Sequence, residues 1–269
     1  MIKAKKSLGQ NWLKSESAIK EIIRAGEIEP GEWILEIGPG RGALTKELLK
    51  AEAQVLAIEK DDNLINLLQE KFNSEIKAKK LILLHADAIG LDLTRELKKQ
   101  KINSYKLIAN IPYHITGQII RKFLSEEKIQ PSLMVLMLQK EVARRIIGAN
   151  PSTSLKVADK ESILSLSVKV YGEPKYIKTV PAGAFEPKPN VDSAILQIKN
   201  ISKKFFTKTG DEKKFFEIIK KGFAQKRKLL KGNLGVGEDV FATCEIPQQA
   251  RAEDLKLKDW KCLTQEIKD

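Results

Sequence analysis

The chain has 269 residues, of which 42% are hydrophobic and 31% are charged, as in ordinary folded proteins and unlike disordered or fibrous ones. No apolar run approaches the ~20 residues that a membrane helix needs, and the basic N-terminus lacks the apolar core of a secretory signal, so we expect a cytoplasmic protein. Cys244 and Cys262 form no CxxC pattern, and the only histidines are His85 and His114. We therefore expect no metal site, no disulfide framework and a reducing compartment.

The formal net charge is +13, and the excess is uneven. Residues 201–231 contain eleven basic and three acidic side chains, whereas residues 232–269 are net acidic. A solvated helix face would explain the densest block, KKGFAQKRKLLK, by itself, but together with the charge of the whole chain it favours contact with nucleic-acid phosphates. We predict a basic, RNA-binding helix whose contacts are Lys220, Lys221, Lys226, Arg227, Lys228 and Lys231.

The first two thirds of the chain alternate between helical and strand patterns. We expect helices over residues 15–26, 43–51, 61–72, 116–125 and 140–147, and strands over 33–37, 54–58, 81–85, 105–109, 133–138, 164–170 and 194–199. Residues 171–192, rich in proline, predict an ordered but irregular connection. The alternation predicts an α/β fold with a mostly parallel sheet and helices on both faces. Since the pattern becomes helical and basic after residue 200, we expect a cofactor-binding domain over 1–200 and a small helical domain over 201–269.

A glycine loop follows the first predicted strand of this series and precedes a helix. Its glycines, Gly38, Gly40 and Gly42, allow a sharp turn and a close approach to a ligand at the N-terminus of the helix. The loop fits both the dinucleotide pattern and that of S-adenosylmethionine binders. Glu59, at the end of the next strand, can bind ribose hydroxyls of either cofactor. Glu36 favours S-adenosylmethionine, because dinucleotide folds usually have an apolar residue there and a carboxylate suits a cationic cofactor.

The strand at 105–109 is followed by Asn110-Ile111-Pro112-Tyr113. An adenine amine is a poor nucleophile because its lone pair is delocalised into the ring. If the two N–H groups of the amine donated hydrogen bonds to the Asn110 Oδ1 atom and the Pro112 carbonyl, a nucleophilic nitrogen would be favoured. Proline also stiffens the turn that directs this carbonyl. Tyr113 would stack on a base flipped from its surroundings. A plain turn is the alternative, but the upstream glycine loop and Glu59 favour a methyl transfer site.

The order of the motifs resembles that of the KsgA family of small-subunit ribosomal RNA adenine dimethyltransferases and, more distantly, that of the Erm macrolide-resistance methyltransferases. The two motifs nearest the C-terminus favour the KsgA branch. The matching motifs are LGQNWL from Leu8, EIGPGRGALT from Glu36, Asp87-Ala88, NIPY from Asn110, QKEVARR from Gln139, FEPKPNVDS from Phe185, FAQKRKLL from Phe223 and RAEDL from Arg251.

The resemblance implies a Rossmann-like class I S-adenosylmethionine-dependent methyltransferase with a small helical C-terminal domain. It implies dimethylation of N6 on two adjacent adenosines in a loop of small-subunit (16S) rRNA and a role in ribosome biogenesis. The implied partner is small-subunit rRNA or the immature 30S particle, and a monomer is the simplest state. Phe185 would complete a base sandwich with Tyr113. The implied cofactor contacts are Gln10, Asn11, Leu13, Gly38, Gly40, Gly42, Glu59, Asp87, Ala88 and Asn110.

The chain departs from the family pattern at Trp12, where phenylalanine is usual, and at His114, where asparagine is common. Residues 158–167 also differ from the usual stretch, which leaves the pairing of a strand there open. Three other functions are compatible with parts of the sequence. The protein could act chiefly as a non-catalytic ribosome-assembly factor, as an Erm-like 23S rRNA methyltransferase, or as an NAD-linked oxidoreductase.

Overall fold

The computed structural model describes residues 4–5, 8–148 and 160–267, which form two compact units. The first unit comprises Met1–Ala143 and Glu173–Ile201, and the second comprises Arg144–Gly172 and Ser202–Asp269. From Ser202 onward the chain belongs to the second unit, close to the boundary expected at residue 200. Residues 144–172, expected in the first domain, group with the second unit instead. The functional division at residue 200 stays a prediction.

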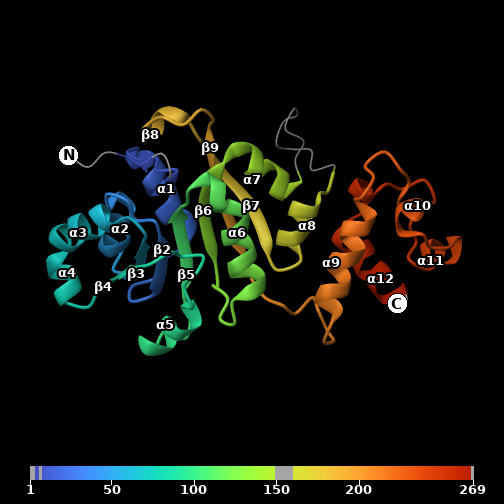
Figure 1. Ribbon diagram of the computed structural model, residues 1–269, viewed down its shortest axis with the longest axis horizontal. Coiled ribbons are helices and arrows are strands. Elements are labelled where there is room, and N and C mark those ends of the chain that lie inside the picture. Colours follow the sequence, from blue (N-terminus) through green and yellow to red (C-terminus); the bar gives the residue numbers. More distant parts are fainter. Residues whose placement is uncertain (1–3, 6–7, 149–159, 268–269) are drawn as a thin grey trace. The chain divides into compact units, whose positions relative to one another are not determined.

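A seven-stranded sheet forms the middle of the first unit, in the order β4-β3-β2-β5-β6-β9-β7 (Figure 1). The strands from β4 to β6 are parallel, and β9 runs antiparallel to both of its neighbours, which confirms the expected mostly parallel sheet. The bounds are β2 (Trp33–Ile37), β3 (Gln54–Glu59), β4 (Leu81–His85), β5 (Lys106–Asn110), β6 (Met134–Gln139), β7 (Glu173–Val180) and β9 (Ser193–Lys199).

The strand expected over residues 164–170 is wrong, because this segment is the helix α8 (Ile163–Lys169). Its apolar residues alternate as in a strand, but the Ser162 hydroxyl caps the helix by accepting from the backbone N–H of Ser165 at 3.1 Å. The edge strand is β7, which lies in the stretch expected to be irregular. Pro174, its second residue, is tolerated because β7 is at the edge of the sheet. Part of the unusual stretch at 158–167 lies outside the described residues.

Helices cover the sheet and bury it on both sides. On one face, α1 (Glu16–Gly26) and α2 (Ala43–Lys50) pack over strand residues such as Ile34, Val55 and Ile108, all fully buried. Alternate residues such as Leu35 and Leu56 point to the other face and are also buried. The remaining helices of the sheet region are α3 (Asp62–Lys71), α4 (Asn73–Lys77), α5 (Leu93–Lys99), α6 (Thr116–Arg121), which continues into a π-helical turn (Lys122–Glu126), and α7 (Lys140–Ile147).

The second unit is helical. In addition to α8 it contains α9 (Asp211–Gly222), α10 (Leu230–Leu234), α11 (Glu238–Thr243) and α12 (Leu257–Glu266), which surround a core that includes Phe215, Phe241 and Trp260. Cys244 and Cys262 form a disulfide, whereas the sequence predicts no disulfide framework. Their spacing gives no signal, because the packing of α11 against α12 places the two Cα atoms 5.7 Å apart.

The sequence predicts that the basic block, residues 220–231, forms one helix. In the structure this block is not one helix. The helix α9 ends at Gly222, residues 223–229 form turns, and α10 begins at Leu230. The Phe223 ring stacks on Trp260 at a centroid distance of 5.7 Å and fixes the chain where it leaves α9. The six cations therefore lie on two helix ends and a turn. In the described part of the chain, no helix has the length and apolar character needed to cross a membrane.

Candidate active site

The parallel strands β2, β3, β4 and β5 end at the same edge of the sheet, where a cavity of about 420 Å³ opens. Its size is ordinary for a small-molecule site. Residues following the strand ends and residues of the N-terminal segment share its wall. The cavity is lined by Leu8, Gly9, Gln10, Asn11, Trp12, Ile37, Gly38, Gly40, Ile58, Glu59, Lys60, Leu64, Ala86, Asp87, Ala88, Ile89, Asn110, Ile111, Pro112, Tyr113, His114, Ile115 and Gln118.

The glycine loop gives a ligand access to the backbone. Gly38 has a φ of 67°, which disfavours other residues, and a side chain there would meet no atom within 4 Å. Gly40 lies against the Trp12 ring, and the Arg41 guanidinium also contacts this ring, 3.9 Å from its centroid. Gly42 packs against Phe72 and does not line the cavity, so its place in the structure is explained by helix packing.

Glu59 presents a fixed carboxylate at the end of β3. Its Oε1 atom accepts from the backbone N–H groups of Lys60 and Asp61 at 2.8 and 2.9 Å, and its Oε2 atom accepts from that of Gly40 at 3.3 Å. Burial raises the pKa of Glu59 despite these hydrogen bonds. The side chain is therefore held rigidly in the wall of the cavity, where a carboxylate can accept two hydroxyl hydrogen bonds.

Asp87 lies across the cavity after β4. Its Oδ2 atom pairs with the Lys60 ammonium at 2.8 Å, and its Oδ1 atom accepts from the backbone N–H of Ile89 at 2.9 Å. These contacts, chiefly the one from Lys60, lower the pKa of Asp87, so the group is a carboxylate at neutral pH. It can accept a hydrogen bond from an amine, as the family resemblance implies for the adenine of the cofactor.

The turn after β5 brings together three of the four residues expected to act in the reaction. Asn110 donates from Nδ2 to the carbonyl of Asn11 at 3.1 Å, which leaves Oδ1 as the atom that can accept. Pro112, with φ −58°, immediately precedes the 3₁₀ turn Tyr113–Ile115. The hydroxyl groups of Tyr113 and Ser193 are 2.7 Å apart, and burial raises the pKa of Tyr113.

Phe185 and Leu13 are not brought into the cavity. The two residues face each other in the pairing of β1 (Trp12–Leu13) with β8 (Phe185–Glu186), and Phe185 is only 2% exposed. In this structure Phe185 is a core residue. Its expected role in a base sandwich stays a prediction, as does the expected contact of Leu13 with the cofactor.

Glu36 lies beneath α2 and outside the lining of the cavity. It is 1% exposed, and its Oε2 atom accepts from the Thr45 hydroxyl at 2.7 Å. Burial raises the pKa of Glu36 to about 8. The carboxyl is therefore held mostly in its neutral form at pH 7, which differs from the carboxylate expected beside a cationic cofactor.

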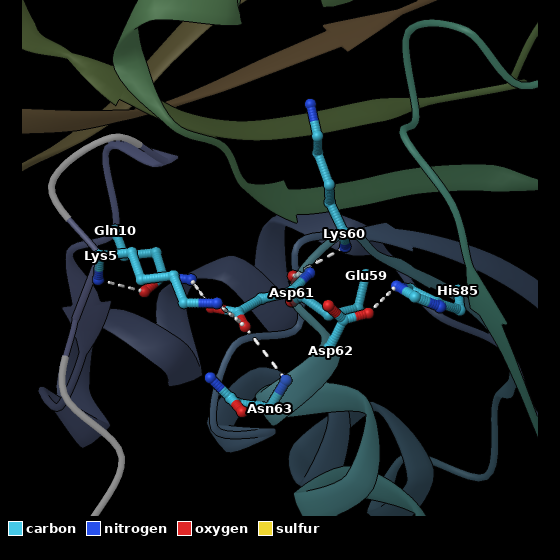
Figure 2. A network of polar contacts seen from close by, with 8 residues as sticks. All are labelled: Lys5, Gln10, Glu59, Lys60, Asp61, Asp62, Asn63 and His85. Atoms are coloured by element: carbon cyan, nitrogen blue, oxygen red, sulfur yellow. Dashed lines mark hydrogen bonds and ion pairs between the residues drawn. The ribbon is translucent and has the colours of Figure 1, made fainter.

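Gln10 lines the cavity, but both polar ends of its side chain are used within the protein. Its Nε2 atom donates to Asp61 at 2.8 Å, and its Oε1 atom accepts from the backbone N–H of Lys5 at 2.7 Å. Figure 2 shows Lys5 and Gln10 converging on Asp61, while the neighbouring Asp62 pairs with His85. Asn11 and Ala88 line the cavity as expected.

Sequence reasoning missed several wall residues. Ile37 and Ile58 immediately precede Gly38 and Glu59, so their position on the strand ends could have indicated them. Lys60 gave no comparable signal, because its ion-pair partner is 27 residues away in the sequence. The apolar wall residues and the carboxylates together form a site suited to a nucleoside-containing ligand.

A mostly parallel sheet that is covered on both faces, with a glycine loop after β2 and a carboxylate at the end of β3, is the fold of class I S-adenosylmethionine-dependent methyltransferases, and this chain shares that fold with solved methyltransferase structures. The family model of ribosomal RNA adenine dimethylases matches residues 1–269, and the chain belongs to that family. Its reaction is therefore rRNA adenine dimethylation, as the resemblance of the motifs predicts. Of the two cofactors that the glycine loop allows, S-adenosylmethionine is the one the family uses.

Individual relatives agree with this assignment. Ribosomal RNA small subunit methyltransferase A of Dehalococcoides mccartyi is 39% identical over 97% of this chain and 88% of its own length. A crystal structure of a dimethyladenosine transferase from Plasmodium falciparum is 25% identical, with a TM-score of 0.76 over 93% of this chain and 95% of that one. The 23S rRNA methyltransferase ErmE is 22% identical, with a TM-score of 0.74 over 95% and 98%, and supports the fold.

Proposed function

We propose that this enzyme dimethylates N6 of two adjacent adenosines in a loop of small-subunit rRNA, within an immature 30S particle. The relative from D. mccartyi is named for the small subunit and matches nearly the whole chain, which supports this choice of substrate. We further propose that the protein works as a monomer in the cytoplasm, where ribosomal subunits are assembled, and contributes to their biogenesis.

One observation carries the proposal for the site. Asn110, Pro112 and Tyr113 border the same cavity as Gly38, Glu59 and Asp87. A cofactor held by the glycine loop and the carboxylates would therefore lie beside a residue able to bind an adenine amine. The open space at Gly38 and the exposed edge of Asp87 fit the methionine end and the adenine of such a cofactor, with Glu59 at the ribose.

The residues of the chain would activate the amine by position and hydrogen bonding. Asn110 Oδ1 and the Pro112 carbonyl would accept hydrogen bonds from the two N–H groups of the amine. The hydrogen bond from Asn110 Nδ2 to the Asn11 carbonyl keeps Oδ1 in position to accept. When bound, S-adenosylmethionine would supply an electrophilic methyl group. The amine nitrogen would form its bond to this carbon as the sulfur–carbon bond breaks, with S-adenosylhomocysteine as the leaving group, and would then release a proton to water. No strong general base is needed for such a transfer, which fits a site built on orientation and electrostatics.

The target base would be held mainly by Tyr113, with Phe185 as a second aromatic contact once a base displaces it from the core. The cations of the basic block would contact rRNA phosphates largely independently of sequence. Five of the six, all except Lys231, are well exposed, and Lys231 pairs with Glu238 at 2.8 Å.

The test is mass spectrometry of rRNA nucleosides after incubation of unmethylated small subunits, and separately large subunits, with the protein and labelled S-adenosylmethionine. We expect labelled N6,N6-dimethyladenosine in small-subunit rRNA, at two adjacent positions. Label found only in large-subunit rRNA would contradict the choice of substrate while leaving the chemistry intact. Absence of label from both would contradict the proposed activity on these particles.

A further inference from the structure

One wall of the cavity is a short N-terminal segment, Leu8–Trp12, whose five residues all contribute to the lining. Of the residues Leu8–Trp12, only Trp12 belongs to a strand, β1, which is just two residues long. Such a segment gains little from backbone pairing alone. Other contacts must therefore keep it against the cavity.

A buried carboxylate supplies additional contacts. The Asp61 Oδ1 atom pairs with the Lys5 ammonium at 2.6 Å, and Oδ2 accepts from Gln10 at 2.8 Å. Gln10 in turn accepts from the backbone N–H of Lys5 at 2.7 Å. The three residues therefore form a closed ring of contacts, here called the Asp61 clasp (Figure 2). The clasp connects Lys5, which precedes the segment, and Gln10, which lies within it, to the same carboxylate.

Asp61 is itself firmly anchored. Its side chain has no exposed surface, its backbone N–H donates to Glu59 Oε1 at 2.9 Å, and its Oδ1 atom caps α3 by accepting from the Asn63 N–H at 3.1 Å. Burial would raise the pKa of Asp61, but the hydrogen bonds from Lys5, Gln10 and Asn63 outweigh it and lower the pKa. A charged acceptor with several donors makes strong hydrogen bonds, and removing it leaves those donors unsatisfied.

We propose that Asp61 is a positioning residue for cofactor binding, because its clasp holds the Leu8–Trp12 wall closed against the cavity next to Glu59. This inference rests on the proposed assignment of the cavity to the cofactor. It is distinct from direct ligand binding, since neither Asp61 nor Lys5 lines the cavity. Weakening the clasp lowers the fraction of molecules with the wall in place, and the apparent dissociation constant rises in proportion.

The experiment compares Asp61→Asn and Lys5→Ala with the wild type. Asparagine keeps the size of the side chain and an oxygen to cap α3, but its amide nitrogen cannot accept from Gln10 and it has no charge for Lys5. The matched control is Asp62→Asn, which removes the adjacent exposed carboxylate that pairs with His85 outside the clasp. S-adenosylhomocysteine binding is measured by calorimetry, and hydrogen exchange of the amides of residues 8–12 is measured in the protein without ligand.

We expect roughly tenfold weaker binding for Asp61→Asn, a smaller loss for the half-exposed Lys5, and faster exchange of residues 8–12 in both variants. Turnover at saturating cofactor should change little, so the effect appears in KM rather than kcat. If the wild type binds and both variants bind and exchange as it does, the clasp inference is wrong while the cofactor site stands. If the wild type does not bind, the cavity assignment fails, and this inference with it.

Discussion

The side chain of Asn110 donates a hydrogen bond from Nδ2 to the backbone carbonyl of Asn11 at 3.1 Å. This contact joins the turn after β5 to the N-terminal wall of the cavity, across 99 positions of sequence. It also determines which end of the amide is available, since the nitrogen is already used. The residue proposed to activate the target amine is thus oriented before any ligand arrives, which is what catalysis by preorganised groups requires.

Replacing Asn110 should abolish most of the activity. For Asn110→Ala we expect kcat to fall about 100-fold on small-subunit particles, because the amine loses one of its two hydrogen-bond acceptors. Incorporation of labelled methyl groups measures the effect. The control is Asn103→Ala, which removes an exposed asparagine from the loop before β5. Wild-type turnover by Asn110→Ala would show that this residue does not activate the amine.

The aromatic ring of Tyr113, not its hydroxyl, should be what the reaction needs. Tyr113→Phe loses only the contact with Ser193, whereas Tyr113→Ala loses the stacking surface, worth about 1–3 kcal/mol per base in nucleic-acid complexes. We expect near-normal kcat/KM for the phenylalanine variant and a loss of about 10- to 100-fold for the alanine variant. Equal losses in both variants would point instead to the hydroxyl.

The buried Glu36 should make stability depend on pH. Its pKa rises from 4.5 to about 8 on folding, so between these values the native state holds a proton that the unfolded chain releases. The contribution of this carboxyl to the free energy of unfolding is therefore greatest below about pH 4.5 and is lost as the pH rises toward 8.

Glu36→Gln removes this titration and can still accept from Thr45. We expect the variant to be more stable than the wild type at pH 9, by roughly 5 kcal/mol at most, with the difference shrinking toward acid pH. Denaturant unfolding at a series of pH values measures it. Glu70→Gln, at an exposed position of α3, is the control. A difference between Glu36→Gln and wild type that does not vary with pH would contradict the buried, protonated state.

The exposed turn of the basic block should control how strongly salt weakens binding of the protein to the small-subunit particle. Reversing Lys226, Arg227 and Lys228 to glutamate should weaken binding and lower the slope of log K against log salt by about 2 to 3, if each contacts a phosphate. The control reverses the exposed Lys77, Lys79 and Lys80, which gives the same change in net charge at another site. Equal effects of the two triple variants would contradict a specific role for the block.

The disulfide should stabilise the helical unit. Closing a loop between residues 18 positions apart is expected to contribute about 3 kcal/mol by limiting the unfolded chain. We expect reductant to lower the midpoint of thermal unfolding of the wild type, and a Cys244→Ser, Cys262→Ser double variant to match the reduced protein. A midpoint that reductant leaves unchanged, together with free thiols on titration, would mean that the bond is not formed in solution.

The regular α/β part of the fold follows from local patterns. Six of the seven strands of the sheet were predicted within a few residues, because buried strands such as β2 have clear periodicity. The amphipathic helices α1, α2, α3, α6 and α7 were predicted for the same reason, whereas the short helices α4 and α5 were not. The pattern failed at α8, where alternating apolar residues resemble a strand and a serine cap decides for a helix. It also failed at the basic block, where packing of Phe223 on Trp260, which no local pattern encodes, ends the helix.

The site could be predicted to the extent that its residues follow strand ends or match motifs. Gly38, Glu59, Asp87 and Asn110 border one cavity, as their places in the alternating pattern suggest. Contacts between distant segments, such as that of Gln10 with Asp61, have no signature in a single sequence. Whether a carboxyl near a strand end, such as that of Glu36, faces the cavity or is buried beneath a helix depends on how the helices pack over the sheet, and this too requires the folded chain.

Among the described residues, those that line the cavity all fall between Leu8 and Gln118, inside the first unit. The apparatus proposed for delivering a methyl group is therefore encoded apart from the cationic turn proposed to hold RNA. An exchange of the C-terminal helices between relatives would be expected to redirect the same chemistry to a different ribosomal target, with the machinery for transfer left unaltered.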